Sequence, residues 1–251
     1  MSESILRKSS FYAILDSIMY PFKEKSKNEF IVSEKAEKCD ILLSREESNL
    51  INRNTSNSIV YQYNNKKNIE EAVKALNGYT IYPHSIFSFT SDIYSKCKHK
   101  IYREGLEIDN HREVIDYGQG LSQLITQLFM TLLNSKMAVV EHKSSVLRLN
   151  PYRSNYPYGF TTSIDDTWDL KFDNQFEDTY SIKAYIKDDV LITELYTNSR
   201  DIERVELKKY NNKEYREDCI CENIIINRFI YYKNSELEND EVLKLSDRRK
   251  L

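Results

Sequence analysis

Residues 117–133, YGQGLSQLITQLFMTLL, decide the fold. Their apolar side chains recur every three or four residues, as in a helix that buries one stripe. The apolar positions are Leu121, Leu124, Ile125, Leu128, Phe129, Leu132 and Leu133. Gly118 and Gly120 form a turn ahead of this run, and Ser122 stands at or near the N-cap. The sequence therefore predicts a buried helix over 121–133 that is entered through a glycine turn.

Segments typical of β-strands surround this helix. Most of them follow it, and Lys187-Asp188-Asp189 and Asn211-Asn212 are expected hairpin turns. The predicted strands are 39–43, 79–90 with a break at Pro83, 137–141, 158–164, 168–172, 180–186 and 190–196. Residues 44–58 suggest a loop or a weak helix, and Asn68 is expected to cap a helix over 69–77 that ends before Gly78. This order predicts an α+β fold in which a central helix packs on a mainly antiparallel sheet.

Composition excludes several classes of protein. The chain has 251 residues, 40% of them hydrophobic, with 5 Gly and 4 Pro, which excludes collagen-like and disordered classes. A formal charge of −3 disfavours nucleic-acid binding. The four cysteines and four histidines form no metal-ligand spacing, so we expect reduced cysteines, no metal and no cofactor. The stretch 11–19 is too short and too polar for a membrane span, and we expect a cytoplasmic protein.

Six motifs in order resemble the VanW family. The run 76–89, LNGYTIYPHSIFSF, resembles that family's L-N-G, short strand and P-G-E-x-F-S-F, and 102–106, YREGL, resembles its Y-x-x-G-L. Residues 118–123, GQGLSQ, stand where the family has G-G-G-x-C-Q. Further along, 139–141 (VVE), 158–162 (YGFTT) and 168–174 (WDLKFDN) resemble I-V-E-R, G-x-D-A-T and D-L-x-x-x-N. The resemblance divides the chain into 1–67, a VanW-like domain 68–196, and a β-hairpin appendage 197–251.

The family pattern has a chemical meaning. A Cys at a helix N-terminus with a later His and Asp resembles the organisation of transglutaminase-like and papain-like folds, which implies acyl transfer or amide hydrolysis. In this sequence the Cys position holds Ser122, the His position Ser145 and the Asp position Thr161. A serine hydroxyl needs an adjacent base, and the aligned base position offers another hydroxyl. The inherited mechanism is therefore not expected to operate.

Two hypotheses follow. The first is a VanW-like protein that has lost the catalytic groups and binds a peptide, an amide-bearing small molecule or a partner protein, in an antibiotic- or cell-envelope-related pathway. Its cleft would lie around Gly118, Gly120, Gln123, Ser145 and Thr161. The second is a diverged acyl-transfer or amide-processing enzyme with Ser122 as nucleophile and His142 or His111 as base. An imidazole nitrogen near the Ser122 oxygen would favour the enzyme.

Overall fold

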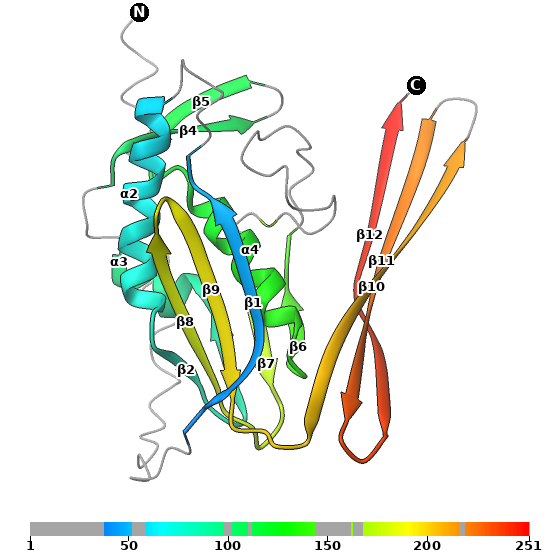
Figure 1. The fold of residues 1–251 in the computed structure, drawn as a ribbon. Helices are drawn as coiled ribbons and strands as arrows, with labels where there is room; N and C mark the ends of the chain where they lie inside the picture. The colour runs from blue at the N-terminus through cyan, green and yellow to red at the C-terminus, as the bar shows by residue number, and fades with distance from the viewer. Residues whose placement is uncertain are drawn as a thin grey trace, which may run out of the picture. The chain divides into compact units, whose positions relative to one another are not determined.

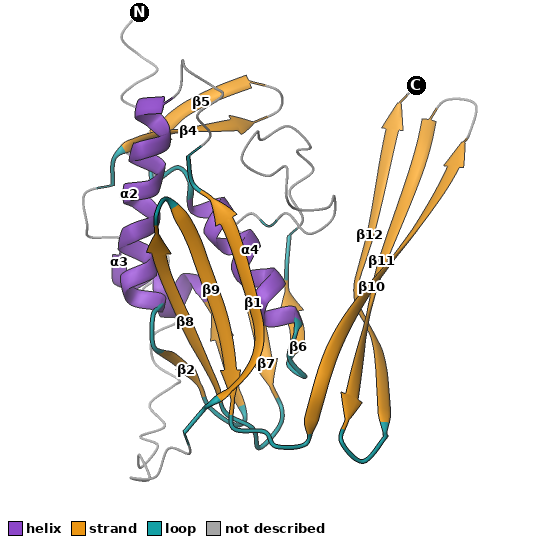
Figure 2. Cartoon of the chain, viewed as in Figure 1, coloured by secondary structure: helices purple, strands orange, loops and turns teal. Residues whose placement is uncertain are grey.

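A computed structural model describes residues 38–51, 59–97, 102–109, 112–143, 162, 168–215 and 219–250. The chain divides into two compact units, 1–36 and 37–251, and every described residue belongs to the second. Helices and antiparallel strands are both present, so the predicted α+β class is confirmed (Figure 1, Figure 2).

The central sheet has the strand order β1-β9-β8-β2, and all its neighbours are antiparallel. Its strands are β1 (Ile41–Asn49), β9 (Val190–Thr197), β8 (Tyr180–Lys187) and β2 (Tyr79–Ile81). The long helix α2 (Ile59–Leu76) and α4 (Leu121–Leu133) both lie against one face of this sheet (Figure 1). Asp188 and Asp189 make the β8–β9 turn with φ of 51° and 65°, as the Lys187-Asp188-Asp189 motif predicts.

Three smaller sheets complete the described fold. The first has the order β3-β7-β6, the second pairs β4 with β5, and the third has the order β10-β11-β12. Their bounds are β3 (Ser85–Ser88), β7 (Lys171–Asn174), β6 (Ala138–Glu141), β4 (Glu104–Asp109), β5 (Arg112–Tyr117), β10 (Ile202–Tyr215), β11 (Cys219–Tyr232) and β12 (Leu237–Lys250). A π-helical turn, η3 (Phe89–Tyr94), and a short helix, α3 (Ser95–Cys97), follow β3.

Helix α4 is the centre of the core, and its predicted bounds are confirmed. Eleven of its residues are buried, and the apolar ones pack in one cluster with side chains from α2, from the central sheet and from the sheet that contains β7. Phe129 of α4 lies 6.1 Å from Phe172 of β7, measured between ring centroids. Burying a side chain of this size contributes about 1.5–3 kcal/mol, so this helix supplies much of the stability of the fold.

Three local predictions are wrong. Helix α2 begins at Ile59 rather than 69, and Asn68 lies inside it instead of capping it, because its amide bonds to other parts of the chain. Strand β1 runs through 44–49, where a loop or weak helix was expected, because the serines of this strand bond to α4. Asn211-Asn212 is not a turn, since both residues pair with β11 inside β10.

The sheet β10-β11-β12 falls within the predicted appendage 197–251. Its residues Ile224 and Ile226 belong to the main core cluster. Arg228 of β11, 3% exposed, donates to the carbonyl oxygens of Ser135 and of Met137 (2.7 Å), just after α4 ends. It also pairs with Asp240 across the strands. One buried guanidinium thus links this sheet to the exit of α4.

Candidate functional site

The candidate site is the N-terminus of α4. Gly120 is the N-cap residue with a φ of 101°, and no side chain caps the helix. Ser122 is the second residue of the helix, so the expectation that it serves as the cap is wrong. A Cβ on Gly120 would lie 2.8 Å from the Cβ of Asn65 in α2 and 3.0 Å from its Cα. Gly120 is therefore needed both for its backbone conformation and for the close approach of the turn to α2.

Two asparagines of α2 hold this turn in place. The Asn68 amide donates to the carbonyl oxygens of Gln119 and Arg103, both at 2.9 Å, and its Oδ1 accepts from the Arg103 N–H at 2.8 Å. One turn earlier, the Asn65 amide exchanges two hydrogen bonds with the backbone of Leu106 in β4. Both asparagines are buried and imitate a neighbouring peptide group. Gly118 and Gly120 thus belong to a rigid structural junction, which explains both glycines without a ligand.

Gln123 faces the central sheet. Its Nε2 donates to Ser48 Oγ and to the Asn49 carbonyl oxygen, each at 2.9 Å, and the residue is 7% exposed. The sequence analysis places Gln123 beside a ligand-binding cleft. In the structure its amide N–H groups join α4 to β1.

Gln123 begins a buried polar seam along α4, which the sequence analysis missed. Gln127, fully buried, donates to the carbonyl oxygens of Glu46 and Leu191 at 2.9 and 3.1 Å and accepts from Ser48 Oγ at 2.5 Å. Thr131, four residues further on, shares a 2.7 Å hydrogen bond with Thr193. The four-residue spacing of these polar side chains was the available signal, because i and i+4 lie on one face of a helix.

His142, the candidate base, lies just after β6. Its ring stacks on Phe129, with centroids 3.9 Å apart and planes at 17°. Nε2 lies 3.0 Å from Thr162 Oγ1, and Nδ1 is buried with no hydrogen-bond partner in the described part of the chain. Burial lowers the pKa of His142 to about 4, because desolvation disfavours the imidazolium. At neutral pH the ring is uncharged and a poor proton acceptor.

Ser122 and His142 contact different parts of α4. The imidazole of His142 stacks on Phe129, which is seven residues after Ser122 in α4. Seven residues of helix rise about 10 Å. Thr126 lies between them and accepts a 2.9 Å hydrogen bond from the Thr162 N–H. The imidazole is thus held by Thr162 and Phe129 rather than aimed at the Ser122 hydroxyl. The other predicted site residues, Ser145, Thr161 and the alternative base His111, lie outside the described residues.

The motifs quoted above meet in a second polar cluster. Asp169, 7% exposed, accepts from Ser88 Oγ at 2.6 Å and from the Thr90 hydroxyl at 2.8 Å. Its own N–H donates to Glu141 at 2.7 Å. The Lys171 ammonium, 2.6 Å from the other Glu141 oxygen, lowers the pKa of Glu141. This cluster connects β3, β6, β7 and the start of η3, so its polar groups are used in holding the fold.

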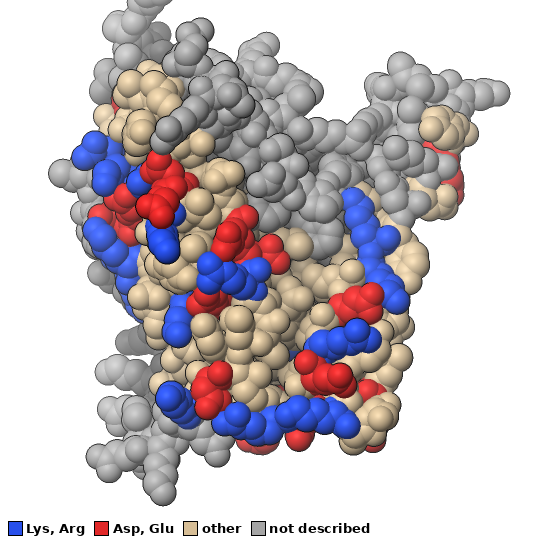
Figure 3. Space-filling model, viewed as in Figure 1, with Lys and Arg blue, Asp and Glu red and all other residues tan. Residues whose placement is uncertain are grey.

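Two further properties concern the described residues only. No group of three or more His, Cys, Asp or Glu among them lies close enough together to hold a metal ion. No helix in the described ranges is long and apolar enough to cross a membrane. On the face drawn in Figure 3, basic and acidic side chains are interspersed rather than gathered by sign.

The fold and the site together define an α+β protein in which a buried helix is entered through a glycine turn and carries Ser122 in its first turn. The profile described as VanW like protein matches residues 64–196, and the chain belongs to this family. It is similar to the vancomycin B-type resistance protein VanW of Enterococcus faecalis (strain ATCC 700802 / V583), with 29% identity over 161 residues. That alignment covers 63% of this chain and 58% of the relative, which is less than two thirds of the relative's length. No solved structure matches the chain significantly.

Proposed function

We propose that this chain is a VanW-family protein with an altered site, which binds a peptide, an amide-bearing small molecule or a partner protein without acyl transfer at Ser122. The observation that carries the proposal is the placement of His142 against Phe129 and Thr162, with a pKa of about 4. A serine nucleophile requires a base within about 3 Å of its hydroxyl and a base pKa near the working pH. The imidazole of His142 meets neither requirement, because its Nε2 is bonded to Thr162 and its pKa lies well below neutral pH.

The name of the E. faecalis relative supplies the biological setting of the proposal. We place the protein in a pathway that responds to vancomycin or remodels the cell envelope, with a ligand that carries amide groups. We propose the cytoplasm as its compartment, because Cys39 and Cys97 are not joined in disulfide bonds. The interspersed charges in Figure 3 favour a peptide or protein over a nucleic acid as partner.

The test is labelling with a fluorophosphonate, which reacts with activated serines. The native chain and Ser122→Ala are treated in parallel, and adducts are located by mass spectrometry. We expect no adduct on Ser122 in the folded native chain. An adduct on Ser122 that disappears in Ser122→Ala would refute the non-catalytic role. A matched His142→Gln sample would then tell whether the imidazole is its base, since labelling would fall in that variant.

A further inference from the structure

The free edge of β8 carries a further inference. Strand β2 covers the outer edge of β8 only as far as Ile182, because its three residues pair with Tyr180, Ser181 and Ile182. From Lys183 to Lys187, no strand of the described chain pairs with β8 on that side. A nine-residue strand, β1, covers β9 on the other side of the sheet. The β8 edge is therefore half covered, and unpaired edges are templates for strand addition.

The outward-pointing backbone groups of this edge can be named. The Ile182 carbonyl oxygen accepts from the Gly78 N–H at 2.8 Å, and the Ala184 N–H donates to Asn77 Oδ1 at 3.2 Å, so both residues point away from β9. Backbone groups alternate sides along a strand, so Ile186 also points outward. The Ala184 carbonyl and both backbone groups of Ile186 have no hydrogen-bond partner among the described residues. The Asn77 side-chain oxygen accepts the hydrogen bond from the Ala184 N–H that a backbone carbonyl of an added strand would otherwise accept.

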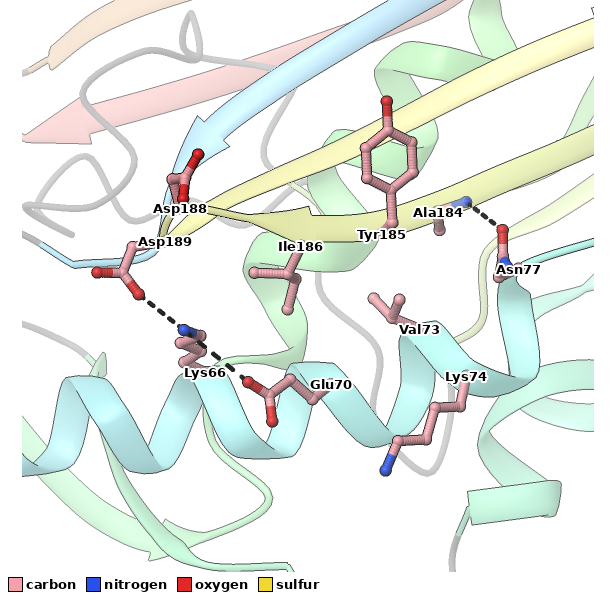
Figure 4. Close-up of a pocket in the computed structure, with 10 residues that line it drawn as sticks. All are labelled: Lys66, Glu70, Val73, Lys74, Asn77, Ala184, Tyr185, Ile186, Asp188 and Asp189. Carbon is pink, nitrogen blue, oxygen red and sulfur yellow. Dashed lines mark hydrogen bonds and ion pairs between the residues drawn. The ribbon is translucent and has the colours of Figure 1, made fainter.

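A groove runs along this edge. It has a volume of about 660 Å³ and lies between β8 and the flank of α2 (Figure 4). Its volume is in the range of ligand sites, roughly 300–1,000 Å³. Val73, Ala184 and Ile186 give it apolar surface, and α2 contributes Lys66, Glu70 and Lys74 at four-residue spacing. A strand edge beside a helix is the geometry in which proteins bind extended peptides by strand addition.

Charge distinguishes the two ends of the groove. Lys66 is held by Asp189 at 2.7 Å, and Lys74 is held by Glu71 at 2.5 Å, so both lysines are already neutralised. Asp188, exposed at the β8–β9 turn, has no ion-pair partner within the described part of the chain. The turn end of the groove therefore favours a basic group.

We propose that the groove between β8 and α2 binds an extended peptide, antiparallel to β8, with a basic residue at its N-terminal end beside Asp188. The peptide continues the line of β2, which fixes its direction. The peptide residue opposite Ile186 exchanges two hydrogen bonds with it and turns its side chain toward Val73. The residue two positions later donates to the Ala184 carbonyl oxygen. This inference takes its ligand class from the proposed binding function but uses no residue of the α4 site.

The probe is acetyl-Arg-Thr-Val-Thr-Val followed by a fluorescein-labelled lysine amide, in which the first Val faces Ile186. A second probe carries Glu in place of Arg. Binding to the full chain is measured by fluorescence polarisation. We expect saturable binding of the Arg probe, at least tenfold tighter than that of the Glu probe, and a reversed order of the two probes with Asp188→Lys.

Two variants separate the backbone contact from side-chain packing. Ile186→Pro removes the outward N–H, and Ile186→Val keeps it while shortening the same side chain. Far-UV circular dichroism shows that each variant is folded. We expect Ile186→Pro to weaken binding at least tenfold and Ile186→Val to weaken it less than threefold. If Ile186→Pro is unfolded, the same probe with an N-methylated residue opposite Ile186 tests the hydrogen bond from the ligand side.

Absence of saturable binding by both probes would overturn the proposal, as would equal binding of the N-methylated and unmodified Arg probes. These outcomes differ from failure of the proposed function. An adduct on Ser122 would refute the non-catalytic role and leave the groove measurement unchanged, whereas loss of groove binding would leave Ser122 unlabelled.

Discussion

Replacing Arg228 with Met should destabilise the whole described fold. The guanidinium donates to the carbonyl oxygens of Ser135 and Met137, and to Asp240 Oδ1 at 3.0 Å, from a residue that is 3% exposed. A third carbonyl, that of Lys136, lies 3.3 Å away. Methionine has a similar length but no donor, so carbonyl groups in the chain that leaves α4 would be buried without partners.

The magnitude follows from those contacts. Each hydrogen bond to a charged group contributes about 1.5–3 kcal/mol, and breaking a buried ion pair costs about 3–5 kcal/mol. The Asp240 side chain is 42% exposed and can recover water, so its loss of a partner costs little. The two buried carbonyl contacts then set an expected loss of about 3–5 kcal/mol in the free energy of unfolding. Arg228→Lys should lose roughly half as much, since it keeps the charge but not the planar fork.

Urea denaturation provides the assay, followed by circular dichroism and by the fluorescence of Trp168, the single tryptophan. The matched control is Arg204→Met in β10, an exposed arginine that lies 4.0 Å from the Tyr231 ring and should cost about 0.5–1 kcal/mol. Trp168 stands before β7, outside the C-terminal sheet. If Arg228→Met shifts circular dichroism but leaves the Trp168 transition unchanged, the sheet β10-β11-β12 unfolds as a separate appendage and the reasoning is refuted.

Three further outcomes can be checked by the same denaturation assay. Gln127→Leu should lower the free energy of unfolding by about 2–4 kcal/mol, because it leaves buried carbonyls and a serine hydroxyl unpaired. The control Gln175→Leu, at an exposed position, should change it by no more than about 0.5 kcal/mol. Equal losses in the two variants would contradict the role of the seam. Between pH 6.5 and about 4, His142 is protonated in the unfolded state but stays neutral in the folded state, so lowering the pH should reduce the free energy of unfolding by up to about 3 kcal/mol. His142→Gln should remove that part of the pH dependence of stability. Gly120→Ala should cost at least about 2 kcal/mol more than Gly78→Ala, because both have positive φ but only Gly120 would bring a Cβ against α2; equal costs would argue against the tight junction.

Helix α4 and the β8–β9 hairpin were predictable because their patterns report burial directly. Seven apolar residues at helical spacing can face one core, and two strands joined by a two-residue Asp-Asp turn have a local register. The true start of α2 was not predictable in this way. Asn65 and Asn68 disfavour a helix interior when considered alone, and they are tolerated because their amides bond to the backbone of distant segments. Such long-range partners leave no local signal.

The candidate site was predictable in part. The glycine turn and the position of Ser122 in the first turn of α4 were predictable from the sequence. Gly118 and Gly120 both adopt positive φ, a conformation that glycine reaches without strain. The destinations of Gln123 and His142 do not follow. Gln123 turns to β1, a strand outside the residues of the family match, and the position of His142 depends on Thr162, twenty residues away. A pattern of residue types fixes neither partner.

The residues that carry the family resemblance mostly build the fold, and this decides what the resemblance means. Ser88, Glu141 and Asp169 come from three motifs and form one hydrogen-bonded cluster. The need to form the sheet β3-β7-β6 is therefore enough to explain these three residues. The resemblance implies acyl-transfer chemistry at other positions of the sequence than these three. Membership of the VanW family thus accounts for the architecture of that sheet, whereas the proposed non-catalytic role rests on separate positions, where this sequence has Ser122, Ser145 and Thr161.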